Sequence, residues 1–149
     1  MKTTLSLGVL AALLAAQNTD LKELIRKDKE RLQGTWQIIA AESKGEKVPA
    51  KDLGELFLIF DGDSIQVQED KKKQDRYTFR LNPERKPKQI DFSYTKGPKK
   101  GRTDRAIYLF QGDRLTFCIQ EDETKDRPKE FNTERETALF LVVLERVKK

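Results

Sequence analysis

The most constraining feature of the chain is a succession of short segments, beginning at Thr35, in which apolar and polar residues alternate. A period of two places every second side chain on the same face of a β-strand. No segment long enough for a crossover helix separates one run from the next, so antiparallel neighbours are expected. The eight predicted strands are residues 35–41, 55–60, 64–68, 75–81, 89–94, 105–110, 114–119 and 138–146.

Two of the predicted hairpins share the pattern Phe-x-Gly-Asp-x-(Ile/Leu), beginning at Phe60 and Phe110. A Gly-Asp pair suits the two-residue loop of a type II′ turn, with Gly in the first central position. An internal duplication and shared turn chemistry both explain the likeness. The turns predict four opposed pairs that give each hairpin one apolar face: Phe60 with Ile65, Leu58 with Val67, Phe110 with Leu115, and Tyr108 with Phe117.

Eight antiparallel strands in sequence order can close into an up-and-down barrel, which removes the exposed edges of an open sheet. Closure would place the connections 62–63, 82–88 and 112–113 at one end, and the longer connections 43–54, 95–104 and 120–137 at the other. The sequence therefore predicts an all-β, eight-stranded antiparallel barrel with one closed end and one open mouth fringed by loops.

Trp36, the single tryptophan, begins the first predicted strand at the closed end, where the last strand finishes with Arg146. We therefore expect the Arg146 guanidinium to stack on the indole ring, a cation–π contact worth roughly 0.5–2 kcal/mol.

The composition limits the chemistry that this domain can perform. The 149 residues are enough for one domain, and the 30 basic and 25 acidic residues are interspersed, which gives a net charge of +5 without a nucleic-acid-binding stripe. The chain has no histidine and one cysteine, Cys118, so zinc sites, Ser-His-Asp triads and internal disulfides lose their usual residues. We expect no enzymatic activity, because no pair of carboxylates falls inside the predicted wall. We also expect no metal site and no cofactor.

Residues 1–16 resemble a secretory signal peptide, with Lys2 followed by an apolar run from Leu5 to Ala16. The run is shorter than the roughly 20 residues that a membrane-spanning helix needs. A secreted or periplasmic protein of the cell envelope is expected. The alternative is an N-terminal helix retained in the mature protein, because Leu14 stands where a cleavage site prefers a small residue.

Residues 17–33 form the segment before the barrel domain, residues 34–149, and residues 20–33 have helical periodicity. Asp20 is expected to cap this helix, with Glu23 in a capping-box position. The apolar stripe consists of Leu21, Leu24, Ile25 and Leu32. We expect this stripe to pack on the outer face of the strand at residues 138–146, which is apolar on both faces.

Several short motifs resemble a known family. Gly34-Thr35-Trp36 is similar to the lipocalin G-x-W signature. Residues 32–36, 86–91, 107–109, 112–115 with Cys118, 127–131 and 144–146 stand in the order seen in a family of uncharacterised, mostly planctomycete, secreted lipocalin-like domains. The resemblance implies a lipocalin-like barrel and secretion. The family carries no established activity, so the resemblance leaves the function open.

The inward-facing aromatic side chains beneath the predicted mouth are the candidate ligand-binding residues: Tyr77, Phe79, Phe92, Tyr94, Tyr108 and Phe117. We expect a monomeric, non-enzymatic barrel that binds a small apolar or amphiphilic molecule. The alternative is that these rings fill the barrel and that the protein acts through its loops as a structural or protein-interaction module. The volume of the interior separates the two hypotheses.

Two loop features and one side chain remain open. Residues 127–131 either fold over the mouth as a lid or anchor the longest loop to the wall through the apolar side chain of Phe131. The basic loop 96–102 and the acidic run 121–126 are expected at the same end of the barrel, which leaves the mouth weakly positive. Cys118, on the outward face of its strand, is expected to be a packed thiol; a reactive thiol would need a neighbouring cation such as Arg127.

Overall fold

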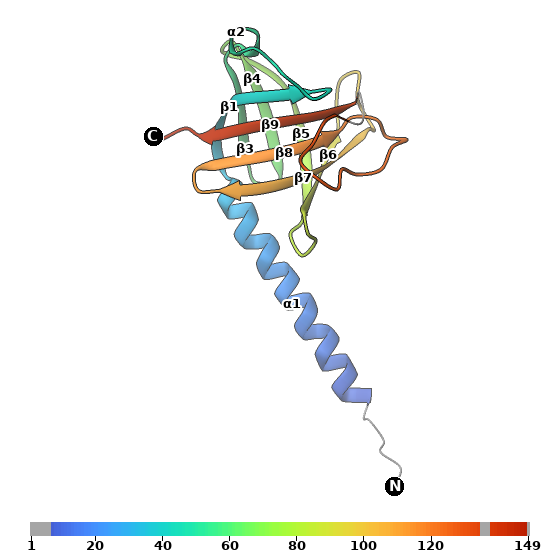
Figure 1. Ribbon diagram of the computed structural model, residues 1–149. Helices are drawn as coiled ribbons and strands as arrows, with labels where there is room; N and C mark the ends of the chain where they lie inside the picture. The colour runs from blue at the N-terminus through green and yellow to red at the C-terminus, as the bar shows by residue number, and fades with distance from the viewer. Residues whose placement is uncertain (1–6, 135–137, 149) are drawn as a thin grey trace.

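The structure is a computed structural model that describes residues 7–134 and 138–148, and the side chains from residue 18 onward with the exception of Asp75. One helix leads into an antiparallel sheet that curls into a barrel (Figure 1). The elements are α1 (Leu7–Leu32), β1 (Gly34–Ser43), β2 (Glu46–Lys47), α2 (Ala50–Leu53), β3 (Leu56–Asp61), β4 (Ser64–Glu69), β5 (Lys72–Asn82), β6 (Lys88–Tyr94), β7 (Thr103–Gln111), β8 (Arg114–Gln120) and β9 (Leu139–Arg146).

The barrel closes between its first and last long strands. The sheet order is β2-β1-β3-β4-β5-β6-β7-β8-β9, and β1 also pairs with β9. This pairing runs from Trp36 opposite Arg146 to Ser43 opposite Phe140, with an irregularity between Ile38 and Ala40. Leaving out the two-residue β2, the wall is a closed eight-stranded antiparallel barrel, so the predicted fold class is confirmed. The short elements β2 and α2 were not predicted.

The two Gly-Asp hairpins have the predicted register. In the β3–β4 hairpin, Phe60 lies opposite Ile65 and Leu58 opposite Val67. In the β7–β8 hairpin, Phe110 lies opposite Leu115 and Tyr108 opposite Phe117. Gly62 and Gly112 have φ angles of 60° and 59°, which a residue with a Cβ adopts at a cost. Glycine at these two positions therefore fixes which side chains face the core.

Trp36 is the centre of the closed end. Its indole is almost fully buried, and its Nε1 donates a hydrogen bond of 2.7 Å to the Leu32 carbonyl. The Arg146 guanidinium lies 4.2 Å from the indole ring, which confirms the predicted cation–π contact. Gly34 has a φ of 110°, and a Cβ there would lie 3.3 Å from Arg146 Nη1. The G-x-W spacing thus leaves room for the arginine that covers the ring.

The last turn of α1 seals the same end. Leu32 is fully buried in the core. The side chain of Gln33 accepts a 2.7 Å hydrogen bond from Gly62 N and donates one of 3.1 Å to Gly62 O. Asp28, which is 8% exposed, accepts hydrogen bonds from Tyr108 Oη at 2.8 Å and Lys88 Nζ at 2.7 Å. The helix end is therefore a plug held by polar contacts on several strands.

The predicted position of the helix is wrong. α1 begins at Leu7 and not at Asp20, and it projects away from the barrel instead of packing on β9 (Figure 1). Leu24, in the predicted apolar stripe, is 41% exposed. Gln33 alone separates α1 from β1, so the chain has no room to fold the helix back along the wall. The predicted signal peptide covers residues 1–6, which lie outside the described part, and the first turns of this helix.

Within the described residues, no helix combines the length and apolar character needed to span a membrane.

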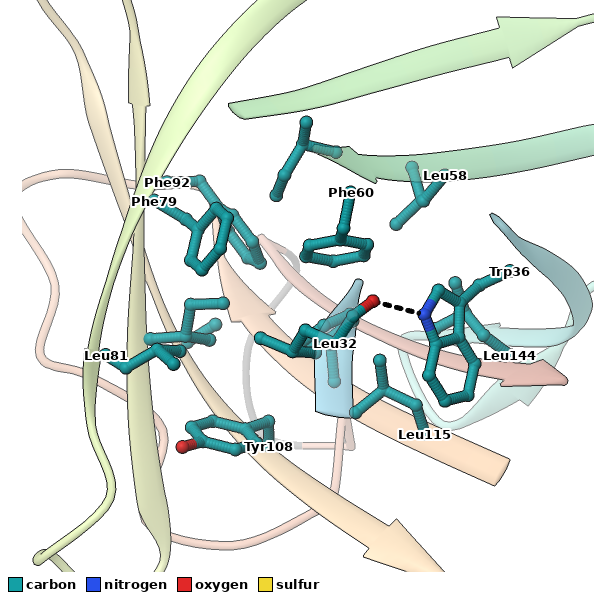
Figure 2. Close-up of a cluster of buried hydrophobic side chains, with 14 residues drawn as sticks. Leu32, Trp36, Leu58, Phe60, Phe79, Leu81, Phe92, Tyr108, Leu115 and Leu144 are labelled. Carbon is teal, nitrogen blue, oxygen red and sulfur yellow. Dashed lines mark hydrogen bonds between the residues drawn. The ribbon is translucent and has the colours of Figure 1, made fainter. Parts of the chain in front are cut away.

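Aromatic rings pack together with aliphatic side chains in the core of the barrel (Figure 2). Phe60 meets Phe79 edge-on with ring centroids 5.4 Å apart, and Phe92 meets Phe117 edge-on at 5.5 Å. Phe60 also stacks on Phe117 at 6.5 Å. Edge-to-face contacts at these distances are favourable packing arrangements, so the rings hold one another in place.

Candidate binding pocket at the mouth

The candidate site is a pocket at the open end of the barrel, where β5 and β6 meet the loop that follows β6. Its volume is about 470 Å³, within the range of small-molecule sites. The lining residues are Val67, Gln74, Tyr77, Tyr94, Lys96, Pro98 and Lys99. We call this the mouth pocket. It combines an apolar floor with two ammonium groups at the rim.

Two tyrosines form the floor of the mouth pocket. Tyr77 and Tyr94 lie opposite each other in the β5–β6 pairing, and their ring centroids are 5.2 Å apart. Tyr77 also packs edge-on against Phe92 at 5.9 Å. The pocket therefore ends where the packed aromatic core begins.

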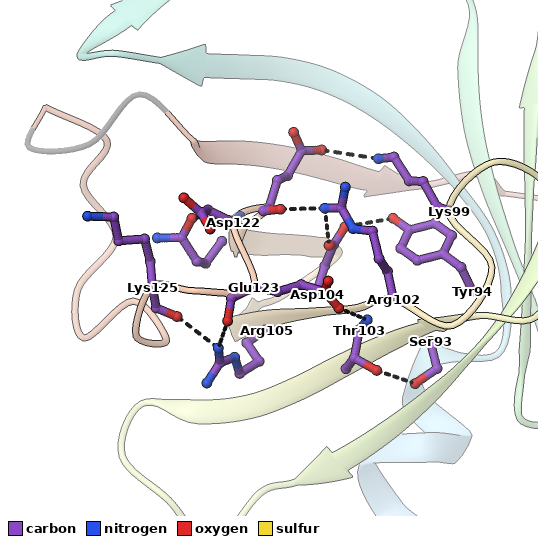
Figure 3. Close-up of polar contacts among 12 residues, drawn as sticks. Ser93, Tyr94, Lys99, Arg102, Thr103, Asp104, Arg105, Asp122, Glu123 and Lys125 are labelled. Atoms are coloured by element: carbon purple, nitrogen blue, oxygen red, sulfur yellow. Dashed lines mark hydrogen bonds and ion pairs between the residues drawn. The ribbon is translucent and has the colours of Figure 1, made fainter.

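A buried carboxylate holds Tyr94 in place (Figure 3). Asp104, near the start of β7, is 1% exposed and accepts a 2.8 Å hydrogen bond from Tyr94 Oη. Its other oxygen accepts a 3.0 Å hydrogen bond from Arg102. Arg102 also donates to the Glu121 carbonyl. The Asp104 charge is thus compensated by one cation and one hydroxyl, as a buried charge requires.

Burial and then the Asp104 carboxylate raise the pKa of Tyr77. Burial, followed by the hydrogen bond to Asp104, raises the pKa of Tyr94 as well. Both phenols therefore stay protonated at neutral pH and act as neutral donors. The Tyr94 hydroxyl donates its hydrogen bond to Asp104. Among the described residues, the Tyr77 hydroxyl forms no side-chain hydrogen bond.

The basic and acidic loops lie at the same end of the barrel, as the sequence predicted, and the structure shows direct contacts between them. Lys99 Nζ lies 3.8 Å from a Glu121 carboxylate oxygen and 5.1 Å from the Tyr94 ring centre. Thr103 N donates to Glu123, and Arg105 donates to the carbonyls of Glu123 and Lys125 (Figure 3). Lys96 is exposed and has no ion pair among the described side chains. Lys96 is therefore an unpaired cation in the lining of the mouth pocket.

The structure separates the six predicted ligand-binding residues into two groups. Tyr77 and Tyr94 line the mouth pocket. Phe79, Phe92, Tyr108 and Phe117 are buried in the core cluster. Tyr108 reaches the closed end, where its hydroxyl meets Asp28. Ligand binding by these residues remains a prediction. Tyr77 and Tyr94 lie beside the mouth pocket, and Tyr108 lines a separate groove at the closed end.

Sequence reasoning missed Asp104 and Arg102. The predicted strand began at Arg105, whereas β7 begins at Thr103. The missed signal was the continuation of the alternation backward from Tyr108 through Ala106 to position 104, which makes Asp104 an inward-facing acid.

The longest loop is pinned to the outer wall, which was one of its two predicted roles. Arg127 donates to the carbonyls of Ile90 and Ala106 at 3.1 and 2.9 Å, and it forms an ion pair with Asp91 at 2.7 Å. Cys118 lies fully buried, and its Sγ is 4.0 Å from the Asn132 carbonyl oxygen. The segment 127–132 of this loop therefore lies on the wall and not over the mouth.

Cys118 should react slowly with an aromatic disulfide reagent at pH 8 in the folded protein. Burial raises the pKa of the thiol from its ordinary value of 9.0 to about 11, so the thiolate fraction falls about a hundredfold. The unfolded thiol ionises first as the pH rises above about 9, so the same shift lowers stability there. Stopped-flow absorbance measures the rate of the thiol reaction in the folded protein and in the protein unfolded by denaturant. Equal reaction rates in the two states would contradict a packed thiol.

No family model, no curated protein and no solved structure matches this chain.

Proposed function

We propose that this protein is a secreted or periplasmic, non-enzymatic, monomeric barrel of the lipocalin-like family its motifs resemble, and that it binds a small amphiphilic molecule in the mouth pocket. The observation that carries the proposal is the pocket's composition. Val67, Tyr77, Tyr94 and Pro98 offer an apolar surface, and Lys96, Lys99 and Gln74 stand around it. Apolar sites with a few polar groups are typical of small-molecule binding.

The packed core restricts where the ligand lies. Below the two tyrosines, the Phe117 ring packs against both Phe60 and Phe92. A ligand that entered deeper would have to displace these rings, at a cost of several kcal/mol per ring. We therefore place the apolar part of the ligand on the tyrosines and its head group at the rim.

The head group is a hydrogen-bond acceptor. Among the described residues, three polar groups reach the pocket without a partner: the Tyr77 hydroxyl, the Lys96 ammonium and the Gln74 side-chain amide. Each can donate a hydrogen bond, and Lys96 adds a positive charge. The buried carboxylate next to Tyr94, Asp104, already accepts hydrogen bonds from Tyr94 and Arg102. A carboxylate or sulfonate head therefore fits better than an ammonium.

Three probes test the proposal on the full chain: decanoate, decanol and naphthalene sulfonate. We expect saturable amide shifts at Val67, Tyr77 and Tyr94 in two-dimensional NMR, with the anions binding more tightly than the alcohol. Val67→Asn and Lys96→Gln should weaken anion binding by about fivefold to tenfold, because each removes one contact worth about 1 kcal/mol. Lys148→Gln, an exposed charge at the opposite end, is the matched control and should change binding less than twofold.

Two results would overturn the mouth pocket as a ligand site. One is the absence of saturable shifts for all three probes up to about 1 mM, where binding is worth only about 4 kcal/mol. The other is binding that Val67→Asn leaves unchanged. The packed aromatic core then favours the second hypothesis, a barrel that acts through its surface as a protein-interaction module.

A further inference from the structure

A second concave surface lies at the closed end of the barrel, opposite the mouth. It is a groove of about 290 Å³ between the end of α1, the β5–β6 connection, β7 and the longest loop. The lining residues are Arg31, Pro83, Arg85, Lys86, Pro87, Lys88, Tyr108, Leu109, Phe110 and Phe131. We call it the basal groove. It shares no lining residue with the mouth pocket.

Among the described residues, the lining of the basal groove includes four cationic side chains and no carboxylate. Arg31 lies 4.2 Å from the centre of the Phe110 ring, and Lys88 is paired with Asp28. Arg85 and Lys86 are exposed and have no ion pair among the described side chains. Two positive charges are therefore uncompensated at one edge of the groove, and a third lies across the Phe110 ring.

The floor of the groove is apolar. Leu109 points outward from β7 and is 40% exposed, which would be ordinary for an isolated surface leucine. Here it adjoins Phe131, Phe110 and Pro87 in one lining. A contiguous apolar surface rimmed by charge marks an interaction site more often than scattered apolar residues do.

The walls of the groove are held before any partner arrives. Lys88 and Tyr108 both bind Asp28 of α1, and Pro83 is buried. Two prolines restrict the β5–β6 connection further, because each fixes its own φ angle. A preformed surface loses less conformational entropy on binding than a mobile one.

We propose that the basal groove docks an extended acidic segment of a partner protein, in which carboxylates flank at least one large apolar side chain. The uncompensated Arg85 and Lys86 would meet the carboxylates, and Leu109 and Phe131 would receive the apolar side chain. The cations come from two separate elements, α1 and the β5–β6 connection, on either side of an apolar floor. That spread fits a chain that presents several side chains better than a single anionic head group.

The test uses the full chain and a fluorescein-labelled octapeptide, Gly-Asp-Glu-Phe-Leu-Glu-Asp-Gly, followed by fluorescence anisotropy. The matched control peptide replaces Asp and Glu by Asn and Gln. The double variant Arg85→Gln/Lys86→Gln should weaken binding of the acidic peptide about tenfold, and the loss should shrink as salt is raised. Leu109→Ser should weaken it about threefold or more, because the leucine contact is apolar. Lys71→Gln/Lys72→Gln, two exposed charges at the other end of the barrel, should change it less than twofold.

The proposal is overturned if the acidic peptide does not bind up to about 1 mM, or if the uncharged peptide binds equally well. It is also overturned if the groove variants bind like the control variant, or if a single-stranded oligonucleotide of equal charge binds as tightly as the peptide. The last outcome would indicate a polyanion surface with no role for the apolar floor. Retention of decanoate binding by the groove variants separates this test from that of the mouth pocket.

Discussion

Replacing Trp36 with alanine should lower the free energy of unfolding by about 3–5 kcal/mol, as expected for the loss of a fully buried Trp. The Trp36 side chain is 1% exposed, and the Arg146 guanidinium stacks on its ring at 4.2 Å. The indole Nε1 donates a hydrogen bond to the Leu32 carbonyl. Removing it opens a cavity between β1 and the helix end. The free energy of unfolding of a domain of this size is about 5–15 kcal/mol, so Trp36→Ala would remove a large part of the stability.

Chemical denaturation followed by circular dichroism measures this loss without relying on tryptophan fluorescence. Trp36→Phe is the companion variant, because it keeps an aromatic ring but leaves the Leu32 carbonyl without its donor, at a cost of about 1–3 kcal/mol. It also keeps the test informative if the alanine variant does not fold. Trp36→Ala within about 1 kcal/mol of the parent would contradict a central role for the indole.

Replacing Asp104 with alanine should lower the free energy of unfolding by about 2–3 kcal/mol. The carboxylate is 1% exposed and is the shared acceptor of Tyr94 and Arg102. Its removal leaves a guanidinium and a phenol without their acceptor, and breaking such a buried pair commonly costs about 3–5 kcal/mol. The Arg102 side chain is 34% exposed, so water compensates part of that loss.

The control for Asp104 is Asp61→Asn, an exposed acid at the closed end, which should change stability by less than about 0.5 kcal/mol. Asp104→Leu combined with Arg102→Leu should recover much of the loss, because replacing both partners leaves no charge unpaired. Thermal and urea unfolding give the three values. An Asp104→Ala variant as stable as Asp61→Asn would show that the carboxylate does not organise the mouth.

The wall of the barrel could be predicted from the sequence because its signals are local. Alternation identifies the inward face of each strand, and a Gly-Asp loop fixes which residues lie opposite each other. Phe60 opposite Ile65 follows from four intervening residues alone. Arg146 on Trp36 required one further step, the assumption that the sheet closes.

The position at which the helix packs could not be predicted from its apolar stripe. Periodicity identifies the apolar face of a helix or strand, but it does not say which element covers that face. Cys118 and Ile107 form an apolar patch outside the barrel that the longest loop covers, with Arg127 pinning it. The helix end is held at the closed end by contacts between residues far apart in the sequence, such as Asp28 with Lys88 and Tyr108, which no local pattern reveals.

Depth along the barrel was the missing information for the candidate site. Alternation placed Tyr77 and Phe79 on the same inward face, but only the first lies at the mouth. Whether an inward ring lines a space or fills it depends on its neighbours across the barrel, such as Phe60 against Phe79. The basal groove joins residues from four separate parts of the chain, so no local pattern reveals it.

Nuclear Overhauser contacts in the folded chain test closure of the barrel and its helical plug most directly. A closed barrel predicts cross-strand contacts between Trp36 and Arg146 and between Ile38 and Leu144, together with contacts from the Leu32 methyl groups to the Trp36 indole. The absence of the β1–β9 contacts, with the Leu24 side chain packed on the outer face of β9 instead, would contradict it.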